Sequence, residues 1–273
     1  MSDNQGRYYF VSDVHLGLAD GSAQKRQSDF CDFLDNLPED TAGLFLLGDI
    51  FDFWVEYPGW IEPGYDDVLQ RFKALTSRGC AVFFFKGNHD WWTLDYFEKE
   101  LGMTVVDEPY KVLTLCGERL CIGHGDGLGC RRITDLFIFR AFRNPVLIWC
   151  LRRLPRRWIL SFGRRWSAKS RKGSKDYVFD IENSDIKRWC ENFALRSPDG
   201  PPIDRFIFGH YHCPCSTTLR CPNGVGHDVE GATVGHNGHR TSPPTCSGVC
   251  TLTILGDWGK GISYLKMPER GRA

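Results

Sequence analysis

The sequence predicts an α/β fold in which polar side chains gather at the carboxyl ends of several strands. Short apolar runs alternate with amphipathic stretches over the first half of the chain, which is typical of βαβ units. Five polar clusters each directly follow one of the apolar runs. Because residues at the carboxyl ends of strands in an open α/β sheet converge on one crevice, we expect the clusters to form a single site.

The apolar runs and the periodic stretches define the predicted elements in chain order. Helices require apolar residues at a spacing of three or four, and proline interrupts them. The strands that precede the clusters are Arg7–Ser12, Gly43–Leu47, Cys80–Lys86, Leu120–Gly123 and Asp204–Phe208; further strands are predicted at Tyr110–Leu115, Arg119–Gly123, Val249–Leu255 and Ile262–Met267. The predicted helices are Ala23–Asn36, Tyr65–Ser77, Thr93–Leu101 and Tyr177–Leu195, with a helical stretch over Ile133–Ser170 that Pro145 and Pro155 interrupt.

The composition is that of an ordinary water-exposed globular protein of 273 residues. No run approaches the roughly 18–20 apolar residues that a membrane-spanning helix needs. The sequence from Met1 to Gly6 lacks a basic region followed by an apolar region, so it is not a secretory signal. We therefore expect a cytoplasmic location.

The net charge of zero conceals a strong asymmetry along the chain. Residues 131–175 contain fourteen Lys and Arg and a single acid, Asp135, so this segment carries +13 and the rest of the chain −13. The segment interleaves its arginines with large apolar residues such as Phe137, Trp149 and Trp158. Such a basic amphipathic element is suited to an anionic lipid surface.

The five clusters carry side chains that bind divalent metal ions. They are Asp13-Val14-His15, Gly48-Asp49, Gly87-Asn88-His89-Asp90, Gly123-His124-Gly125-Asp126 and Gly209-His210-Tyr211-His212. Together they supply seven candidate ligands, which are Asp13, His15, Asp49, Asn88, His124, His210 and His212. Two metal ions ~4 Å apart that share one carboxylate need about this many ligands and are a recurrent solution for phosphate-ester hydrolysis. The mixed donors suit Mn²⁺, Fe²⁺, Co²⁺ or Zn²⁺ better than Ca²⁺.

In this order and spacing, the clusters resemble those of the calcineurin-like metallophosphoesterase superfamily. The resemblance implies a β-sandwich of the metallophosphoesterase type, flanked by helices, and two divalent metal ions. By this resemblance, one ion takes Asp13, His15, Asp49 and His212, and the other takes Asp49, Asn88, His124 and His210. We expect His89 to act as a proton donor or phosphate contact, with Asp90 orienting it.

Further local features resemble the UDP-2,3-diacylglucosamine hydrolase family of lipid A synthesis. They are Ser12–Leu16, Gly48–Trp54, His124-Gly125-Asp126, Ser174-Lys175 and Leu255-Gly256-Asp257-Trp258. The resemblance implies hydrolysis of a diphosphate bond to release UMP and 2,3-diacylglucosamine 1-phosphate, with two metal ions that we expect to be Mn²⁺. Its substrate contacts would be Asn88, His89, Arg132, Lys169, Lys172, Lys175 and His210.

Two departures indicate a divergent branch of that family. The best-known branch has Arg where this chain has His89, and acidic residues where this chain has Arg131-Arg132. We also considered a phosphodiesterase or nucleotide pyrophosphatase that acts on a non-lipid substrate, a nuclease, and a scaffold that has lost its activity. Because all seven candidate ligands are present, an enzyme is the favoured interpretation.

The expected organisation is a core of residues 1–130 and 176–273 with a helical lid insertion at 131–175. The lid would hold the acyl chains of a nucleotide-linked glycolipid and contact the anionic inner membrane peripherally, although an ordinary lid with solvated arginines would have the same composition. A nucleic acid partner is not expected, because aliphatic bulk does not serve phosphate-backbone binding.

A late segment, residues 213–247, is rich in Gly, Pro, Cys and His and has no periodicity, so it is expected to be a loop within the core. Its cysteines and histidines leave three interpretations open: a structural metal site, a disulfide or a plain loop.

Overall fold

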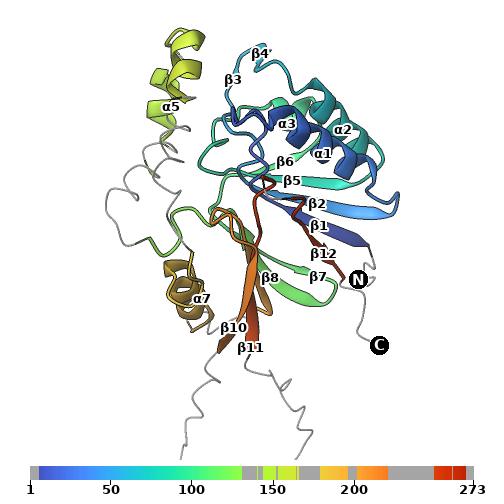
Figure 1. Cartoon of the computed structure of the whole chain (residues 1–273), viewed down its shortest axis with the longest axis vertical. Coiled ribbons are helices and arrows are strands. Elements are labelled where there is room, and N and C mark those ends of the chain that lie inside the picture. The colour runs from blue at the N-terminus through green and yellow to red at the C-terminus, as the bar shows by residue number, and fades with distance from the viewer. Residues whose placement is uncertain are drawn as a thin grey trace, which may run out of the picture.

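Two five-stranded sheets form the centre of the molecule in the computed structural model (Figure 1). The structure describes residues 6–130, 140, 144–151, 153–163, 165, 179–195, 202–220, 249–259 and 261–268. The first sheet has the strand order β12-β1-β2-β5-β6 and the second β10-β11-β9-β8-β7. The predicted sandwich of sheets flanked by helices is therefore confirmed.

The first sheet is built mainly from parallel strands joined through helices. Its strands are β1 (Arg7–Val11), β2 (Thr41–Leu47), β5 (Ala81–Phe85), β6 (Thr104–Val106) and β12 (Leu265–Met267). β1, β2, β5 and β6 run parallel to their neighbours, and β12 pairs antiparallel with β1. The helices α1 (Ala23–Asp35), α2 (Asp66–Ser77) and α3 (Tyr96–Lys99) belong to the same half of the molecule (Figure 1).

The second sheet has three parallel strands at its centre and an antiparallel strand at each edge. Its strands are β7 (Lys111–Leu115), β8 (Glu118–Gly123), β9 (Arg205–Phe208), β10 (Cys215–Arg220) and β11 (Val249–Ile254). β8, β9 and β11 are parallel, while β7 and β10 are antiparallel to β8 and β11. The helix α7 (Asp185–Leu195) packs on this sheet through Ile186, Cys190 and other apolar residues. Further described elements are a small hairpin of β3 (Glu56–Tyr57) and β4 (Trp60–Ile61), the helix α5 (Pro145–Leu151) and a helical segment at residues 156–163.

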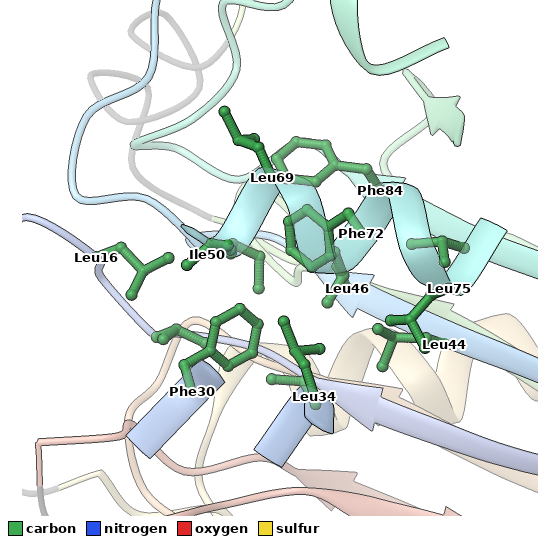
Figure 2. Packing of buried hydrophobic residues seen from close by; sticks show 14 of the residues in the cluster. Leu16, Phe30, Leu34, Leu44, Leu46, Ile50, Leu69, Phe72, Leu75 and Phe84 are labelled. Carbon is green, nitrogen blue, oxygen red and sulfur yellow. The ribbon is translucent and has the colours of Figure 1, made fainter. Parts of the chain in front are cut away.

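Alternating side chains of the strands divide the core into layers. Tyr8 and Phe10 of β1 point between the two sheets, whereas Tyr9 and Val11 point toward the helices. The helix-facing layer of the first sheet contains Leu44, Leu46 and Phe84, which pack against Phe30 of α1 and Phe72 of α2 (Figure 2). Because both faces of these strands are buried, their sequences read as continuous apolar runs.

Several element predictions need correction. The candidate ligands do not come from one open sheet but from two sheets that face each other. The helix expected at Tyr177–Leu195 begins at Asp185, because residues 179–184 form turns in which Asp180 accepts the backbone N–H of Glu182 and Ser184 caps the helix. The helix expected at Thr93–Leu101 is limited to Tyr96–Lys99.

The late loop and three short strands also differ from the predictions. Cys215–Arg220 forms the strand β10, because its β-branched threonines pair with β11 and bury Leu219. Residues 221–248 lie outside the described residues, and so do the interpretations of their cysteines and histidines. The short strands β3, β4 and β6 were not predicted, since two or three residues give no detectable periodicity.

Phe45 lies in the layer between the two sheets, and its substitution tests how much this packing stabilises the fold. Its ring stacks between Phe10 and Phe83, with both ring centroids at 4.8 Å, and it is 2% exposed. We expect Phe45→Ala to lower the free energy of unfolding by about 3–5 kcal/mol, measured by urea denaturation. The matched control Phe162→Ala removes a ring that is 52% exposed and should cost less than about 1 kcal/mol. Equal costs for the two variants would contradict this description of the core.

Candidate metal centre

All five clusters lie where the parallel strands of the two sheets end. Asp13 and His15 follow β1, Asp49 follows β2, and Asn88 follows β5. His124 follows β8, and His210 and His212 follow β9, so the second sheet supplies the remaining candidates. Possible ligand atoms lie within 4.8 Å of one another in three groups, one of which is His15, Asp52 and His89. The other two groups contain only candidate ligands, and they are Asp13, His15, Asp49 and His212, and Asp49, His124 and His210. Asp49 belongs to both groups, as expected for a carboxylate that two metal ions share.

Five of the candidate ligands have a left-handed backbone. The φ angles are 53° at Asp13, 51° at His15, 54° at Asp49, 72° at His210 and 54° at His212. Such a conformation costs about 1–3 kcal/mol for a residue other than glycine and persists only where the surroundings enforce it. These turns redirect the chain at the strand ends, and their recurrence at five candidate ligands marks the site as a functional one.

Two glycines let the backbone approach the carboxylates closely. A Cβ at Gly87 would lie 2.1 Å from Asp49 Oδ1, and a Cβ at Gly209 would lie 2.5 Å from Asp13 Oδ2. Neither position can carry a side chain without moving a carboxylate. The cradle around Asp13 and Asp49, with nitrogen and oxygen donors on all sides, fits a pair of divalent cations.

Hydrogen bonds to carbonyl groups fix the orientation of the His124 ring. His124 Nδ1 donates to Leu47 O at 2.8 Å, since a carbonyl can only accept. This turns Nε2 toward the cluster, 3.2 Å from Asn88 Oδ1 and 3.4 Å from Asp49 Oδ2. His15 Nε2 and His212 Nε2 likewise face each other at 3.3 Å. The candidate nitrogen donors therefore point at common positions.

The buried charges of the cluster shift one another's pKa values. Burial disfavours the ionised carboxylate of Asp49, but the nearby rings of His124 and His89 outweigh this and hold its pKa well below the usual range. Burial likewise disfavours protonated His124, yet Asp49 raises the pKa of His124 to about 10. Burial and repulsion from His124 lower the pKa of His210 to about 4. The metal-free cluster thus holds a proton on His124 that compensates Asp49.

Asp90 has a different role from the one expected. Its carboxylate does not orient His89 but accepts backbone N–H groups of Gly87, Asp49, Ile50 and Phe51 at 2.7–3.2 Å. Burial, together with the charge of Asp49, raises the pKa of Asp90 to about 7. Asp90 therefore ties the loop after β5 to the loop after β2, a contact between segments 40 residues apart that no local pattern reveals.

Asp52 is the residue that holds the His89 ring. His89 Nδ1 donates to Asp52 O at 2.9 Å, which leaves Nε2 available for chemistry. The Asp52 carboxylate lies 3.8 Å from His15 Nδ1 and 3.9 Å from His89 Nδ1. Asp52 was not among the predicted site residues, although it lies in the segment Gly48–Trp54 that resembles the hydrolase family.

The remaining expected substrate contacts cannot be placed. Arg132, Lys169, Lys172 and Lys175 lie outside the described residues.

Among the described helices, none has both the length and the apolar character needed to cross a bilayer.

Comparison with known proteins defines the class of this protein. The calcineurin-like phosphoesterase family matches residues 6–214, so the chain belongs to that family. It is an enzyme, a hydrolase that depends on divalent metal ions.

Several relatives of this chain share one name. The UDP-2,3-diacylglucosamine hydrolase of Porphyromonas gingivalis is 32% identical over 235 residues, which cover 79% of this chain and 87% of the relative. The enzymes of the same name from Actinobacillus succinogenes and Vibrio vulnificus are 28% and 26% identical and are covered to 94% each. These moderate identities agree with the predicted divergent branch.

The protonated state of His124 predicts a pH dependence of metal binding. A metal ion binds neutral imidazole, so below a pKa of about 10 an ion bound by His124 must displace its proton. We expect the apparent affinity to rise with pH through neutrality and about one proton to be released at this position. Calorimetric titration of metal-free protein with Mn²⁺ in buffers of different ionisation enthalpy measures the number released.

The control is His124→Ala, which should release about one proton fewer. If the wild type and this variant released the same number of protons, His124 would not be a metal ligand that gives up a proton on binding.

Proposed function

We propose that this enzyme hydrolyses the diphosphate bond of UDP-2,3-diacylglucosamine and releases UMP and 2,3-diacylglucosamine 1-phosphate. The observation that carries the proposal is the similarity to hydrolases of that name over most of the chain, with an ordered set of seven candidate metal ligands. Phosphoryl transfer needs charge stabilisation and positioning above all, and this cluster offers both.

The metal ions would be held by the two overlapping groups. We assign one ion to Asp13, His15, Asp49 and His212, and the other to Asp49, Asn88, His124 and His210. Mixed carboxylate, amide and imidazole donors suit Mn²⁺, which is the ion that the resemblance to the hydrolase family implies. When bound, such ions supply Lewis acidity toward a phosphoryl oxygen and stabilise the charge of the transition state.

His89 is assigned the transfer of a proton to the leaving phosphate oxygen. Its Nδ1 is fixed by the carbonyl of Asp52, and the ring is 7% exposed at the edge of the cluster. A positioned general acid contributes about 10²- to 10⁴-fold to a rate. Asp90 supports this residue indirectly, because it fixes the loop that carries it.

Residues 131–175 are assigned to a lid over the site, inserted into a core of residues 1–130 and 176–273. In its described part, Asn144 caps α5, where Pro145 starts the helix, and residues 156–163 form a second helical segment. Ile148, Leu151, Ile159 and Leu160 pack with Trp91 and Trp92, which directly follow the loop of His89 and Asp90. This contact places an apolar surface next to the catalytic loop, as an acylated substrate requires.

The opposite face of the lid is assigned to the membrane. Val146, Trp149, Trp158 and Phe162 are 52–67% exposed. Arg153 stacks on Trp149 with its guanidinium carbon 3.2 Å from the ring centroid, and Arg156 and Arg157 are also exposed. Aromatic side chains between arginines bind an interface of anionic lipids, where each cation contributes ~1 kcal/mol. We therefore propose peripheral association with the inner membrane.

The function is tested with metal-stripped protein and UDP-2,3-diacylglucosamine in detergent. We expect UMP release only after Mn²⁺ is added, because the cluster alone cannot neutralise the diphosphate. The phosphorus products are followed by chromatography. If the enzyme cleaved a soluble phosphodiester but left the lipid intact, the proposed substrate would be wrong and a non-lipid substrate would be indicated.

Two variants separate metal binding from proton transfer. His124→Ala should lose metal-dependent UMP release, whereas His89→Gln should keep its Mn²⁺ affinity and lose about 10²-fold or more in kcat. If His89→Gln kept the wild-type kcat, His89 would not be the proton donor.

Membrane association is tested by co-sedimentation with vesicles of phosphatidylcholine containing 30% phosphatidylglycerol, a composition chosen here to supply about one anionic lipid in three. We expect wild-type protein to bind these vesicles and the double variant Trp149→Ala/Trp158→Ala to bind about tenfold more weakly. The matched control Tyr264→Ala removes an aromatic ring that is 48% exposed and directly precedes β12 in the sequence. The strand β12 lies away from α5 (Figure 1). If the double variant and Tyr264→Ala lost vesicle binding to the same extent, the exposed aromatic residues of the lid would not be the membrane contact.

A further inference from the structure

The segment after β11 brings a carboxylate to the site from near the end of the chain. Asp257 Oδ2 lies 3.6 Å from His212 Nδ1, on the side of the ring away from the cluster. His212 Nε2 faces inward, 3.3 Å from His15 Nε2 and 3.4 Å from Asp13 Oδ1. His212 thus lies between a carboxylate inside the cluster and another outside it.

Asp257 is held in place by its neighbours on both sides. Gly256 N donates to Ser263 Oγ at 3.0 Å, and Leu255 N donates to Phe208 O at 2.8 Å. Trp258 is 4% exposed, packs edge-on against Phe30 and Phe33 with centroids at 5.2 and 5.5 Å, and donates its backbone N–H to Asp13 O at 3.3 Å. The carboxylate is therefore fixed before any ligand binds.

The second oxygen of Asp257 is already engaged. Oδ1 accepts the backbone N–H of Gly259 at 2.9 Å, which sets the rotation of the carboxylate and turns Oδ2 toward His212. A carboxylate at Nδ1 favours the tautomer with the proton on Nδ1 and the lone pair on Nε2. That tautomer is the one that can donate to a metal ion inside the cluster.

His212 needs this support more than the other oriented histidines do. Carbonyl groups of Leu47 and Asp52 hold the rings of His124 and His89, which are 1% and 7% exposed. The His212 side chain is 36% exposed, so packing restrains it least.

We propose that Asp257 is a positioning residue that fixes the ring and tautomer of His212 and thereby strengthens one of the two metal positions. The inference deepens the proposed function, because it rests on the assignment of His212 as a metal ligand. Asp257 acts through His212 and is not assigned a contact with the substrate.

The diagnostic variant is Asp257→Asn, which keeps the shape of the side chain. Its amide oxygen still accepts the Gly259 N–H, so the amide NH₂ faces His212 Nδ1 and donates to it. This favours the opposite tautomer, in which Nε2 carries the proton and cannot bind a metal ion. The matched control is Asp204→Asn, in which Asp204 Oδ2 accepts the backbone N–H of Arg119 at 2.7 Å away from the cluster.

Metal-free protein is titrated with Mn²⁺, and free Mn²⁺ is measured by electron paramagnetic resonance. We expect two equivalents to bind to wild type and Asp204→Asn, and one of the two affinities to fall about 10- to 100-fold in Asp257→Asn. The thermal midpoint of the metal-free variant should match that of the control, which separates the effect from unfolding.

Two unchanged Mn²⁺ affinities in Asp257→Asn, or an equal loss at both positions, would overturn the proposal. These outcomes are distinct from a failure of the proposed function. Wild-type protein that binds two Mn²⁺ but leaves the UDP-lipid intact would refute the substrate and leave the role of Asp257 standing.

Discussion

Negative charge buried between the ends of two sheets is the constraint on which this structure depends. Asp13, Asp49 and Asp90 are 0–1% exposed, and isolated carboxylates at such depth are costly. Different groups compensate each carboxylate. Asp90 accepts four backbone N–H groups, and Asp13 accepts the hydroxyl of Ser12 and the backbone N–H of His210. Asp49 accepts the backbone N–H of His89 and lies beside the ring of His124. Backbone groups alone surround the carboxylate of Asp90, whereas Asp49 and Asp13 each lie 3.4 Å from a histidine ring, that of His124 and that of His212. Divalent cations bound by Asp13 and Asp49 would compensate the remaining charge.

The same constraint explains why the site depends on the whole sandwich. The first sheet supplies Asp13, His15, Asp49 and Asn88, and the second supplies His124, His210 and His212. Hydrogen bonds cross between the two sets, from His124 Nδ1 to Leu47 O and from His210 N to the carboxylate of Asp13. The left-handed turns at five candidate ligands are strained, and the packing of Phe10, Phe45 and Ile207 between the sheets stabilises the arrangement that holds them.

The candidate ligands could be predicted from the sequence, but the contacts that hold them could not. Asp13, Asp49 and His124 were recognisable because they belong to five ordered clusters of metal-binding residue types, each directly after an apolar run. The division of the strands between two sheets was not recognisable, because strands buried on both faces lack alternation, and Tyr8 and Tyr9 look alike in sequence although they face different layers. The bond from Asp90 to Ile50 spans 40 residues, and that of His89 to Asp52 uses a backbone carbonyl. Such contacts depend on tertiary geometry, so the role expected of Asp90 fell to Asp52.

Under the proposed function, the loop that carries His89 and the basic lid act on the same diphosphate group. An arginine at this position, as in the best-known branch of the resembling hydrolases, supplies a permanent charge but cannot give up a proton near neutral pH. A histidine whose Nδ1 is fixed by Asp52 can transfer a proton, and it leaves more of the charge of a diphosphate to be neutralised by other groups. The segment 131–175 carries fourteen basic residues, and its described part packs against Trp91 and Trp92, directly after His89 and Asp90. Proton transfer from the loop and charge from the lid are therefore complementary, and the departure at His89 is compatible with hydrolysis of the same kind of bond.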